Sequence, residues 1–424
     1  MRSSRWKRYS LAAALIVFPI VALASYLLWP QATNATQDIA GLDASVERGR
    51  YLATISNCAS CHTTKDGQPF AGGVKFHTEF GTLYSTNITS DEKTGIGSWS
   101  FGDFFLAMKH GLRPDGTPLY PAFPYPSFAK LADADIASIY LYMKTIAPVD
   151  APARENELSF PYNQRFMLRA WNKIFHEPAT YTPDPARSQE WNRGAYLVQG
   201  PAHCGACHTP RNTLGAERTD FAFTGGLVFD EVRPGKVREW SAVNLTPAKT
   251  GLGHWDAACI VEYLKTGECD HAVVHGPMND VILNSTRHLD DADAKAIATY
   301  LTGLPAMEAD TARPPSEKQL AAGEISYTVH CGSCHLPTGL GDEGLGVTLA
   351  GNSIVQSADP SSLINVILYG PRLPPPPFVS ERSRMKPFGK RLSDDDIANL
   401  TTYVRASFGN RAAAVTPEQV RKQR

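Results

Sequence analysis

The chain has 424 residues, of which 43% are hydrophobic and 20% are charged, and its formal net charge is −1. This length fits several small domains with ordinary hydrophobic cores better than one small domain. The near-neutral charge argues against a polyanionic partner such as nucleic acid.

The first 30 residues differ in composition from the rest of the chain. A basic start is followed by an apolar run from Leu11 to Trp29, which only Pro19 and Ser25 interrupt. Such a run is either a signal peptide that is cleaved on export or an uncleaved membrane anchor of about 20 residues. We expect residues 1–30 to be one or the other. Both interpretations place the remaining residues outside the cytoplasm.

The pattern Cys-x-x-Cys-His occurs three times, starting at Cys58, Cys204 and Cys331. It is typical of c-type haem attachment, because two thiols on one turn of chain can add to the two haem vinyl groups and the histidine then reaches the iron. A zinc site or a thioredoxin-like dithiol is the alternative for each copy, but three copies favour three covalently bound haem c groups. The expected attachment residues are Cys58, Cys61, Cys204, Cys207, Cys331 and Cys334, and the expected proximal iron ligands are His62, His208 and His335.

Internal repeats divide the exported part of the chain. Residues Arg48–Leu52, before the first haem motif, match Arg193–Leu197, before the second, in the form Arg-Gly-x-Tyr-Leu. Each unit ends in an acidic segment followed by apolar residues at helical spacing, which predicts a terminal helix that packs across the helix before the haem motif. The sequence therefore predicts an all-α fold of three tandem class I cytochrome c domains. Their expected bounds are 42–149, 189–305 and 316–408, with a connector at 150–188 and a polar tail at 409–424.

The connector is longer than an ordinary loop. It carries Met167, Leu168, Trp171, Ile174 and Phe175 at helical spacing, which predicts one amphipathic helix. Three surroundings fit such a helix: the surface of a haem domain, a membrane surface or a partner subunit. The sequence leaves these three open.

A sixth iron ligand is expected in two of the domains. A methionine thioether in this position closes the iron site and raises its reduction potential. Met278, in Gly-Pro-Met, and Met385, in Met-Lys-Pro-Phe-Gly, both lie before the terminal helix of their domain. We expect these two methionines to be axial ligands of the second and third haems.

The first domain lacks this methionine. Met278 follows Trp255 by 23 residues, whereas the residue 24 positions after the matching Trp99 is Phe123, which cannot bind iron. The first haem is therefore either five-coordinate or ligated from elsewhere. The candidate ligand is Met108, which is otherwise a core residue. Weaker candidates are Met143, His110 and His77.

Two cysteines lie outside the haem motifs, Cys259 and Cys269. Ten positions along a straight helix span about 15 Å, which is too far for a disulfide. A bond therefore requires the chain to turn back after Gly267. A disulfide and a pair of buried thiols both remain possible in an oxidising compartment.

The order of these motifs resembles a known family. The segments that carry the resemblance are Tyr84–Thr89, Leu119–Tyr125, Glu190–Leu197 and Cys207–Asn212. They are similar to the triheme cytochrome c subunits of bacterial membrane-bound alcohol, gluconate, sorbitol and aldehyde dehydrogenases, and the resemblance covers about residues 40–410. It implies a separate catalytic subunit, dependent on quinone, flavin or molybdenum, and electron transfer to ubiquinone or a terminal oxidase. Phe123 departs from the alcohol dehydrogenase type and favours a flavin- or molybdenum-linked partner.

The sequence thus predicts an electron-transfer subunit on the periplasmic side of the bacterial cytoplasmic membrane, with no catalytic residues of its own. The organic chemistry would belong to the partner chain. Two alternatives stay open. One is a haem enzyme in which the first haem is an open, peroxidase-like or gas-binding centre, and the other is a stand-alone electron shuttle between respiratory complexes.

Overall fold

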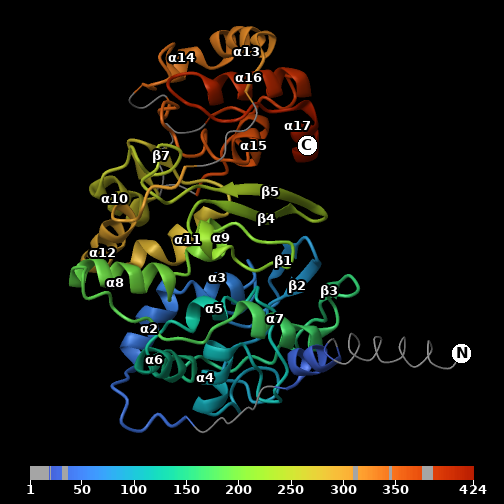
Figure 1. Cartoon of the computed structure of the whole chain (residues 1–424), viewed down its shortest axis with the longest axis vertical. Helices are drawn as coiled ribbons and strands as arrows, with labels where there is room; N and C mark the ends of the chain where they lie inside the picture. The colour runs from blue at the N-terminus through green and yellow to red at the C-terminus, as the bar shows by residue number, and fades with distance from the viewer. Residues whose placement is uncertain (1–18, 20, 31–36, 309–313, 343–345, 375–384) are drawn as a thin grey trace, which may run out of the picture.

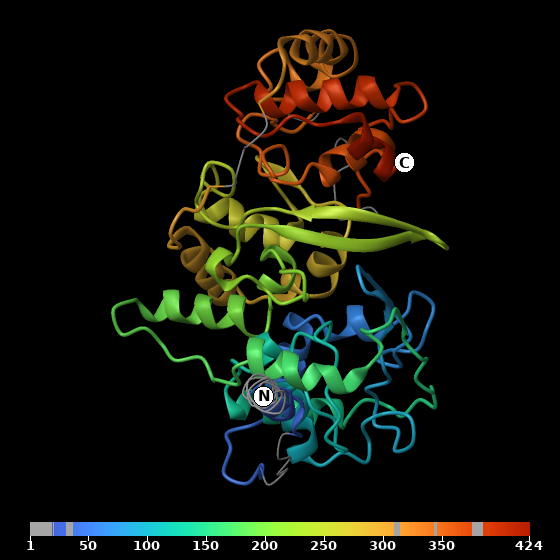
Figure 2. The same ribbon diagram turned by 45° about the vertical axis from the view of Figure 1, so that its right-hand side comes forward.

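The computed structural model describes residues 19, 21–30, 37–308, 314–342, 346–374 and 385–424. The described chain forms three layers in sequence order, from the layer of α2, α4 and α6 at the bottom to the layer of α13, α14 and α16 at the top (Figure 1). The same order is visible after a 45° turn (Figure 2). Each layer therefore comes mainly from one continuous part of the chain.

Each layer contains two crossed helices, and a glycine lies at each crossing. The pairs are α2 (Val46–Ile55) with α6 (Asp133–Met143), α8 (Gln189–Gln199) with α12 (Asp291–Thr302), and α13 (Glu317–His330) with α16 (Asp394–Ala406). A Cβ atom at Gly49 or Gly194 would lie 1.9 Å from a carbonyl oxygen of the partner helix, and one at Gly323 would lie 2.3 Å away. Any larger residue would force the helices apart, which explains why Arg-Gly-x-Tyr-Leu recurs with its glycine unchanged.

Side chains at the helix starts satisfy free backbone N–H groups. Ser45, Ser188 and Ser316 precede the first helix of each pair, and each Oγ accepts a hydrogen bond from the backbone N–H three residues later. Asp290 and Ser393 play the same part for α12 and α16. Acidic residues in the first turns of the second helices also favour the positive end of the helix dipole.

In each of the first two layers, one further helix of matching position lies between the two crossed helices in the sequence. α4 (Phe101–His110) and α10 (Ala257–Thr266) both begin at a capped residue and end at a glycine with positive φ, 62° at Gly111 and 79° at Gly267. The other helices are α3 (Cys58–His62), α5 (Tyr125–Phe128), α7 (Leu168–Phe175), α9 (Gly205–His208), α11 (Met278–Asn284), α14 (Gly332–His335), α15 (Ser361–Tyr369) and α17 (Pro417–Gln423), with 3-10 turns at Arg165–Met167, Thr219–Phe221 and Thr286–His288.

The expectation of an all-α fold is wrong in detail, because the helix-rich chain also contains small antiparallel sheets. The strands are β1 (Lys75–Thr78), β2 (Gly81–Tyr84) and β3 (Glu157–Leu158), β4 (Gly226–Arg233) and β5 (Lys236–Ala242), and β6 (Glu268–Cys269) and β7 (Ala272–Val273). The β4–β5 hairpin turns at Pro234-Gly235, where Gly235 has a φ of 75°. Proline followed by glycine is typical of a type II turn, so this hairpin had a local signal in the sequence.

The first two layers share one hydrophobic core. Leu52, Ile136, Leu197 and Ile297, from α2, α6, α8 and α12, belong to a single cluster of buried side chains. The third layer has its own cluster, which includes Leu363, Ile397 and Leu400. The chain therefore packs as a close pair of layers with a third layer attached.

Two tyrosine–carboxylate contacts join the first two layers reciprocally. The Tyr51 hydroxyl donates to Asp293 Oδ2 at 2.7 Å, and the Tyr196 hydroxyl donates to Asp135 Oδ2. Each carboxylate also pairs with an arginine of its own layer, Asp135 with Arg48 and Asp293 with Arg193. Both aspartates are less than 5% exposed, so each buried carboxylate faces one arginine and one tyrosine hydroxyl. The pattern has the reciprocity of a two-fold dimer interface within one chain.

The polar tail expected at 409–424 is not a separate tail. Val415 and Val420 are fully buried in the core of the third layer. The helix α17 packs on α15 and α16, and Thr416 caps it together with Gln419. The sequence interpretation failed because the two valines are separated by polar residues, and this hides the buried face of a short helix.

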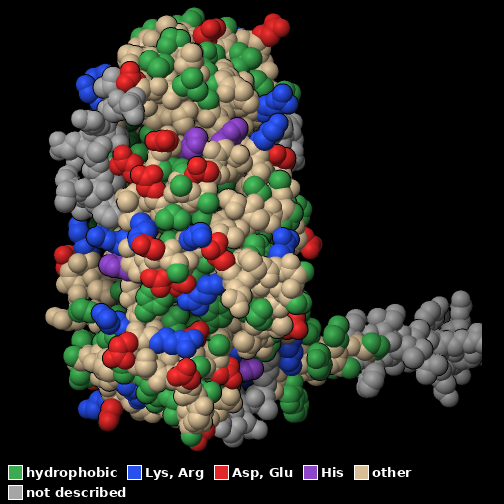
Figure 3. All heavy atoms as spheres, turned by 90° about the vertical axis from the view of Figure 1, so that its left-hand side faces the viewer, with side chains coloured by type: hydrophobic (Ala, Val, Ile, Leu, Met, Phe, Trp, Pro, Cys, Tyr) green, Lys and Arg blue, Asp and Glu red, His purple; other side chains and the backbone are tan. Residues whose placement is uncertain are grey.

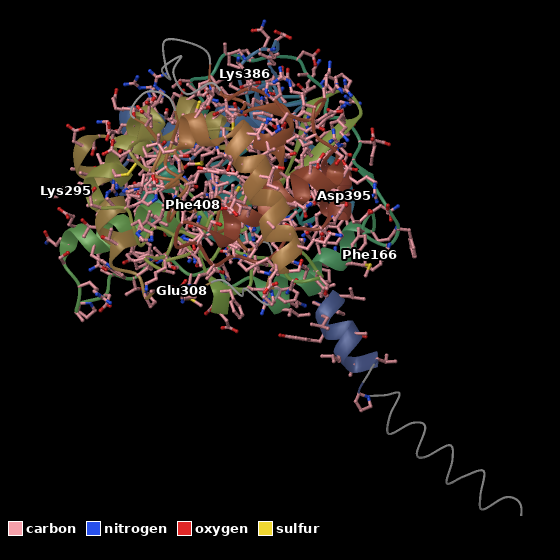
Figure 4. All side chains as sticks on the ribbon, turned by 90° about the horizontal axis from the view of Figure 1, so that it is seen from above. Phe166, Lys295, Glu308, Lys386, Asp395 and Phe408 are labelled. Carbon is pink, nitrogen blue, oxygen red and sulfur yellow. A yellow bond between two sulfur atoms is a disulfide. The ribbon has the colours of Figure 1, made fainter. Side chains whose placement is uncertain are left out.

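Most of the predicted signal or anchor, residues 1–18 and 20, lies outside the described residues. Residues 21–28 are helical and leave the body of the protein beside α7 (Figures 1 and 4). Within the described ranges, no helix combines the length and apolarity needed to cross a membrane. The predicted amphipathic helix of the connector falls where the structure has the turn Arg165–Met167 and α7.

Candidate haem-binding sites

Each Cys-x-x-Cys-His motif forms a short helix directly after the first helix of its crossed pair. These helices are α3, α9 and α14, and each ends at the histidine of its motif. Residues three apart on a helical turn face the same side. The structure therefore presents both thiols of each motif, and the imidazole after them, to one region of the same layer.

All three histidines are held in the same way. The Nδ1 atoms of His62, His208 and His335 lie 2.7, 2.7 and 2.8 Å from the backbone carbonyl oxygens of Thr86, Val243 and Val347. A carbonyl only accepts hydrogen bonds, so Nδ1 carries the proton and Nε2 keeps the lone pair that a metal needs. Burial lowers the pKa of each imidazole, which favours the neutral form that binds iron.

The pKa values of the cysteine thiols are raised, in contrast to those of the histidines. Burial raises the pKa of Cys58, Cys204 and Cys331 to about 12 in each case. A thioredoxin-like dithiol requires a thiol with a depressed pKa. The burial of these thiols therefore argues against a redox-active dithiol and agrees with sulfur atoms that become thioethers.

The first and second sites lie next to one another. Three bonds connect α3 and the residues before it to the second layer: Ser285 Oγ donates to Ile55 O at 2.7 Å, Asn284 Nδ2 donates to Ser60 Oγ at 2.8 Å, and His203 Nε2 donates to Ser56 O at 3.1 Å. The pKa of Cys61 is raised to about 12 by burial first and by the nearby Cys207 second. This last effect places a cysteine of the first motif close to one of the second.

The third site belongs to a layer that binds the second through backbone acceptors. Asn365 Nδ2 donates to Glu239 O at 2.7 Å, and Asn352 Nδ2 donates to His271 O at 2.9 Å. The bonded residues of the second layer lie on β5 and in the turn between β6 and β7. The third layer therefore sits on the side of the second layer that faces away from the first.

The two predicted methionine ligands both pack against apolar side chains. Met278 begins α11 and packs on Val274 and Ile282, while its neighbour Asn279 donates through Nδ2 to Arg372 O at 2.6 Å. Met385 packs against the core of the third layer. Both side chains are thus held in apolar surroundings within the layer of the haem motif that each would serve.

In the first layer, Phe123 lies against Phe128, with 5.4 Å between the ring centroids. Met108 and Met143 are buried on α4 and α6, at 5% and 1% exposure, in the core that the first two layers share. His110 ends α4 and burial lowers its pKa. The last candidate, His77, lies on β1 with Nε2 3.7 Å from Glu231 of β4.

Cys259 and Cys269 form a disulfide, with 5.4 Å between their Cα atoms. The chain turns back as the sequence argument requires. Gly267, with a φ of 79°, ends α10, and the β6–β7 hairpin that follows returns Cys269 to the helix. The bond joins the first turn of α10 to β6, the strand that follows the helix.

Two buried indole groups offer a further test of whether a haem fits. The Nε1 atoms of Trp240 and Trp255 are buried, and neither donates to any other described group. An indole N–H is a donor only, and a buried donor of this kind requires an acceptor. Haem propionates supply such acceptors, so the residues present fit the group. In the sequence, Trp255 marks only the distance to Met278, and nothing in its sequence context indicates the unpaired N–H.

Comparisons with known proteins agree with this geometry. Residues 318–404 match the family described as cytochrome c oxidase, cbb3-type, subunit III. The chain is 38% identical over 396 residues to the cytochrome c subunit of the quinone alcohol dehydrogenase of Gluconacetobacter polyoxogenes, covering 90% of this chain and 84% of that protein. It is 37% identical over 397 residues to the gluconate 2-dehydrogenase cytochrome c subunit of Pantoea cypripedii, covering 89% of both chains. It is 36% identical over 414 residues to the fructose dehydrogenase cytochrome subunit of Gluconobacter japonicus, covering 90% of this chain and 82% of that protein.

Proposed function

Because the chain belongs to the family of cytochrome c subunits of bacterial dehydrogenases, we propose that it binds three haem c groups and relays electrons away from a separate catalytic subunit. It is an electron-transfer subunit, and substrate oxidation takes place on another chain. The partner would be a quinone-, flavin- or molybdenum-dependent dehydrogenase. The acceptor would be ubiquinone or a terminal oxidase.

One observation carries this proposal: the same arrangement of two thiols, one imidazole and one backbone carbonyl recurs three times. The recurrence extends to the distances, since the three Nδ1 to carbonyl contacts agree within 0.1 Å. A hydrogen bond to Nδ1 fixes the tautomer and the ring orientation and raises the basicity of Nε2. A common chemical task at all three sites is the simplest reason for a common geometry.

The haems would supply one-electron redox chemistry when bound. The protein attaches each one through two cysteines and orients one histidine at the iron. Met278 and Met385 would complete two of the sites, and their thioethers would favour the reduced state. Trp240 and Trp255 would donate to propionates.

A second function rests on Phe123. With phenylalanine in the ligand position, the first haem would be five-coordinate unless Met108 reaches the iron, and an open iron can bind peroxide, CO or NO. The chain would then be a haem enzyme in which the second and third haems supply electrons. A stand-alone shuttle is the third candidate, and it requires that the N-terminal segment is cleaved.

We place the protein on the periplasmic side of the cytoplasmic membrane. The apolar run from Leu11 to Trp29 supports export. Attachment would be through the uncleaved N-terminal segment or through peripheral contact. The relatives named above assemble, by their names, as subunits of dehydrogenases, which supports a large protein partner at this location.

Haem content and spin state test the proposal together. The mass of the intact chain, made in cells that attach haem c, should exceed the sequence mass by three haems. The variant Cys331→Ala with Cys334→Ala should carry two. EPR spectra of the oxidised protein should show low-spin signals from all three haems. A high-spin fraction near one third, with CO binding after reduction, would favour the haem enzyme, and zinc in place of haem would refute both functions.

A further inference from the structure

The connector carries an exposed apolar surface, which we call the connector face. Its members are large apolar side chains that are 42% to 79% exposed: Phe160, Tyr162, Phe166, Met167, Ile174 and Leu214. All except Leu214 come from one stretch of 15 residues that ends in α7. Leu214 joins them because Trp171 Nε1 donates to its carbonyl oxygen at 2.9 Å.

The opposite side of α7 holds the connector firmly to the first layer. Asn172 is 1% exposed, and its Oδ1 accepts from the Tyr125 hydroxyl at 2.6 Å. The His176 ring packs edge-on against the Tyr125 ring, with 4.9 Å between their centroids. The outward direction of Phe166, Met167 and Ile174 is therefore set by a fixed helix. Their exposure indicates a contact site, because large exposed apolar patches usually mark surfaces that bind a partner or a membrane.

The apolar N-terminal segment is fastened to this same surface. Lys173 Nζ donates to the carbonyl oxygens of Tyr26 and Trp29, the latter at 3.0 Å, and it lies 4.7 Å from the centre of the Tyr26 ring. Arg169 Nη1 donates to Leu28 O at 3.5 Å. Cations are favourable at the C-terminal end of a helix, where carbonyl groups are free. The basic residues of α7 thus bind the end of the helix at residues 21–28.

The N-terminal helix then leads away from the connector face. Figure 4 shows Phe166 beside the place where this helix leaves the body, and Figure 3 shows the described helical residues leaving the molecule at one edge. In the N-terminal segment, Val21, Leu23 and Tyr26 are 55%, 58% and 65% exposed. The sequence continues apolar from Val21 back to Leu11. The connector face and the exposed apolar side chains of residues 21–29 therefore form neighbouring apolar surfaces.

The charges around the connector face suit a lipid surface. Between Ser159 and His176 the chain contains Arg165, Arg169 and Lys173 and no acidic residue. A short helix with basic side chains next to apolar ones is typical of binding in the headgroup region of an anionic bilayer. The side of the molecule shown in Figure 3 differs, because acidic and basic side chains alternate along it.

We propose that the connector face lies on the membrane surface, with its apolar side chains among the lipid headgroups and acyl chains and the net positive charge of the connector segment near anionic headgroups. This inference rests on the proposed membrane location and names the surface that makes the contact. One short apolar segment gives limited attachment, and a second contact makes binding stable. The arrangement would also fix the orientation of the three layers, with the first nearest the lipid.

Oxidative footprinting of the full haem-loaded chain tests the proposal. The chain is placed in vesicles of equal parts phosphatidylethanolamine and phosphatidylglycerol, and reactivities are normalised to the unfolded chain. Phe166, Met167 and Ile174 should be protected, whereas Ile325 and Val329, an apolar pair on α13 that is 68% and 70% exposed, should stay reactive. Equal reactivity of the two groups would overturn the proposal. Protection that appears only when the catalytic subunit is added would assign the face to that protein instead.

Matched variants give an independent measurement. Phe166→Ser with Ile174→Ser removes two side chains of the connector face, and Ile325→Ser with Val329→Ser removes two of similar exposure elsewhere. The first variant should be released from the same vesicles about tenfold more readily than the second, given the loss of apolar contact. Equal release would contradict the lipid contact. Haem content and reduced spectra of the same samples report separately on the electron-transfer function, so normal haems with a reactive connector face would refute the membrane contact alone.

Discussion

The substitution Gly194→Ala tests the helix crossing on which the haem layers are built. A Cβ at this position would lie 1.9 Å from Ala296 O and 2.7 Å from Tyr300 Cβ. Relieving these contacts requires α8 and α12 to separate by about 1 Å or more, and overpacking of this kind costs about 1–3 kcal/mol. Alanine is otherwise better than glycine within a helix by about 1 kcal/mol. Because the clash is with backbone atoms, we take the upper part of the range, which gives a net loss of about 2 kcal/mol in the free energy of unfolding.

Chemical denaturation of the haem-loaded protein, followed by far-ultraviolet circular dichroism, measures this loss. Gly332→Ala is the matched control, because the nearest atom to its added Cβ is Tyr327 O at 3.7 Å. The first haem motif also has an alanine, Ala59, at the matching position. The control should be neutral or slightly stabilising. A Gly194→Ala protein that is as stable as the wild type would refute the close crossing and the reason given for the repeated glycine.

Three further predictions concern the haem sites. Met278→Leu should convert one haem to the high-spin form and lower its reduction potential, whereas Met167→Leu, at an exposed methionine, should change neither in redox titrations. Met108→Leu should alter the optical spectrum of the first haem alone if Met108 is its ligand, and an unchanged spectrum would exclude it. Burial lowers the pKa of His203 from 6.5, so below about pH 6.5 the unfolded chain binds a proton that the folded chain does not, and stability falls with acidification. His203→Gln should flatten this part of the stability profile between about pH 7 and pH 5, and an equally steep profile would show that other groups cause it.

The sequence predicted motifs and helices well where the spacing of one type of residue is enough to identify them. Cysteine and histidine spacing located the three motifs, which the structure forms as short helices, and acidic starts with apolar stripes predicted α6, α12 and α16. The connector helix followed from the spacing of Trp171, Ile174 and Phe175. In each case a side chain's role depends on neighbours within a few turns of the same helix.

The features that the sequence did not predict depend on tertiary contacts or on weak local signals. Val415 and Val420 are buried only because α17 returns to the third layer. The β4–β5 hairpin was not predicted, because only helical spacing of apolar residues was considered and the Pro234-Gly235 turn is a weak signal alone. The contact between the first two sites depends on Asn284, Ser285 and His203, whose partners lie more than 100 residues away. No pattern in a single sequence records such pairings.

The reciprocal contacts between the first two layers explain why the first site can differ from the second without disturbing the fold. The helix that follows each ligand position supports the other layer: α11, after Met278, supplies Asn284 to the first motif. In turn α5, after Phe123, supplies Phe128, whose ring lies 5.5 Å from the His203 ring beside the second motif. The segment around Phe123 thus has a packing role that is separate from iron ligation. A haem in the first layer would lack a methionine ligand from this segment, while the support that the segment gives to the second layer would be unchanged. The pair of layers, and not the single domain, would then be the unit that tolerates the change.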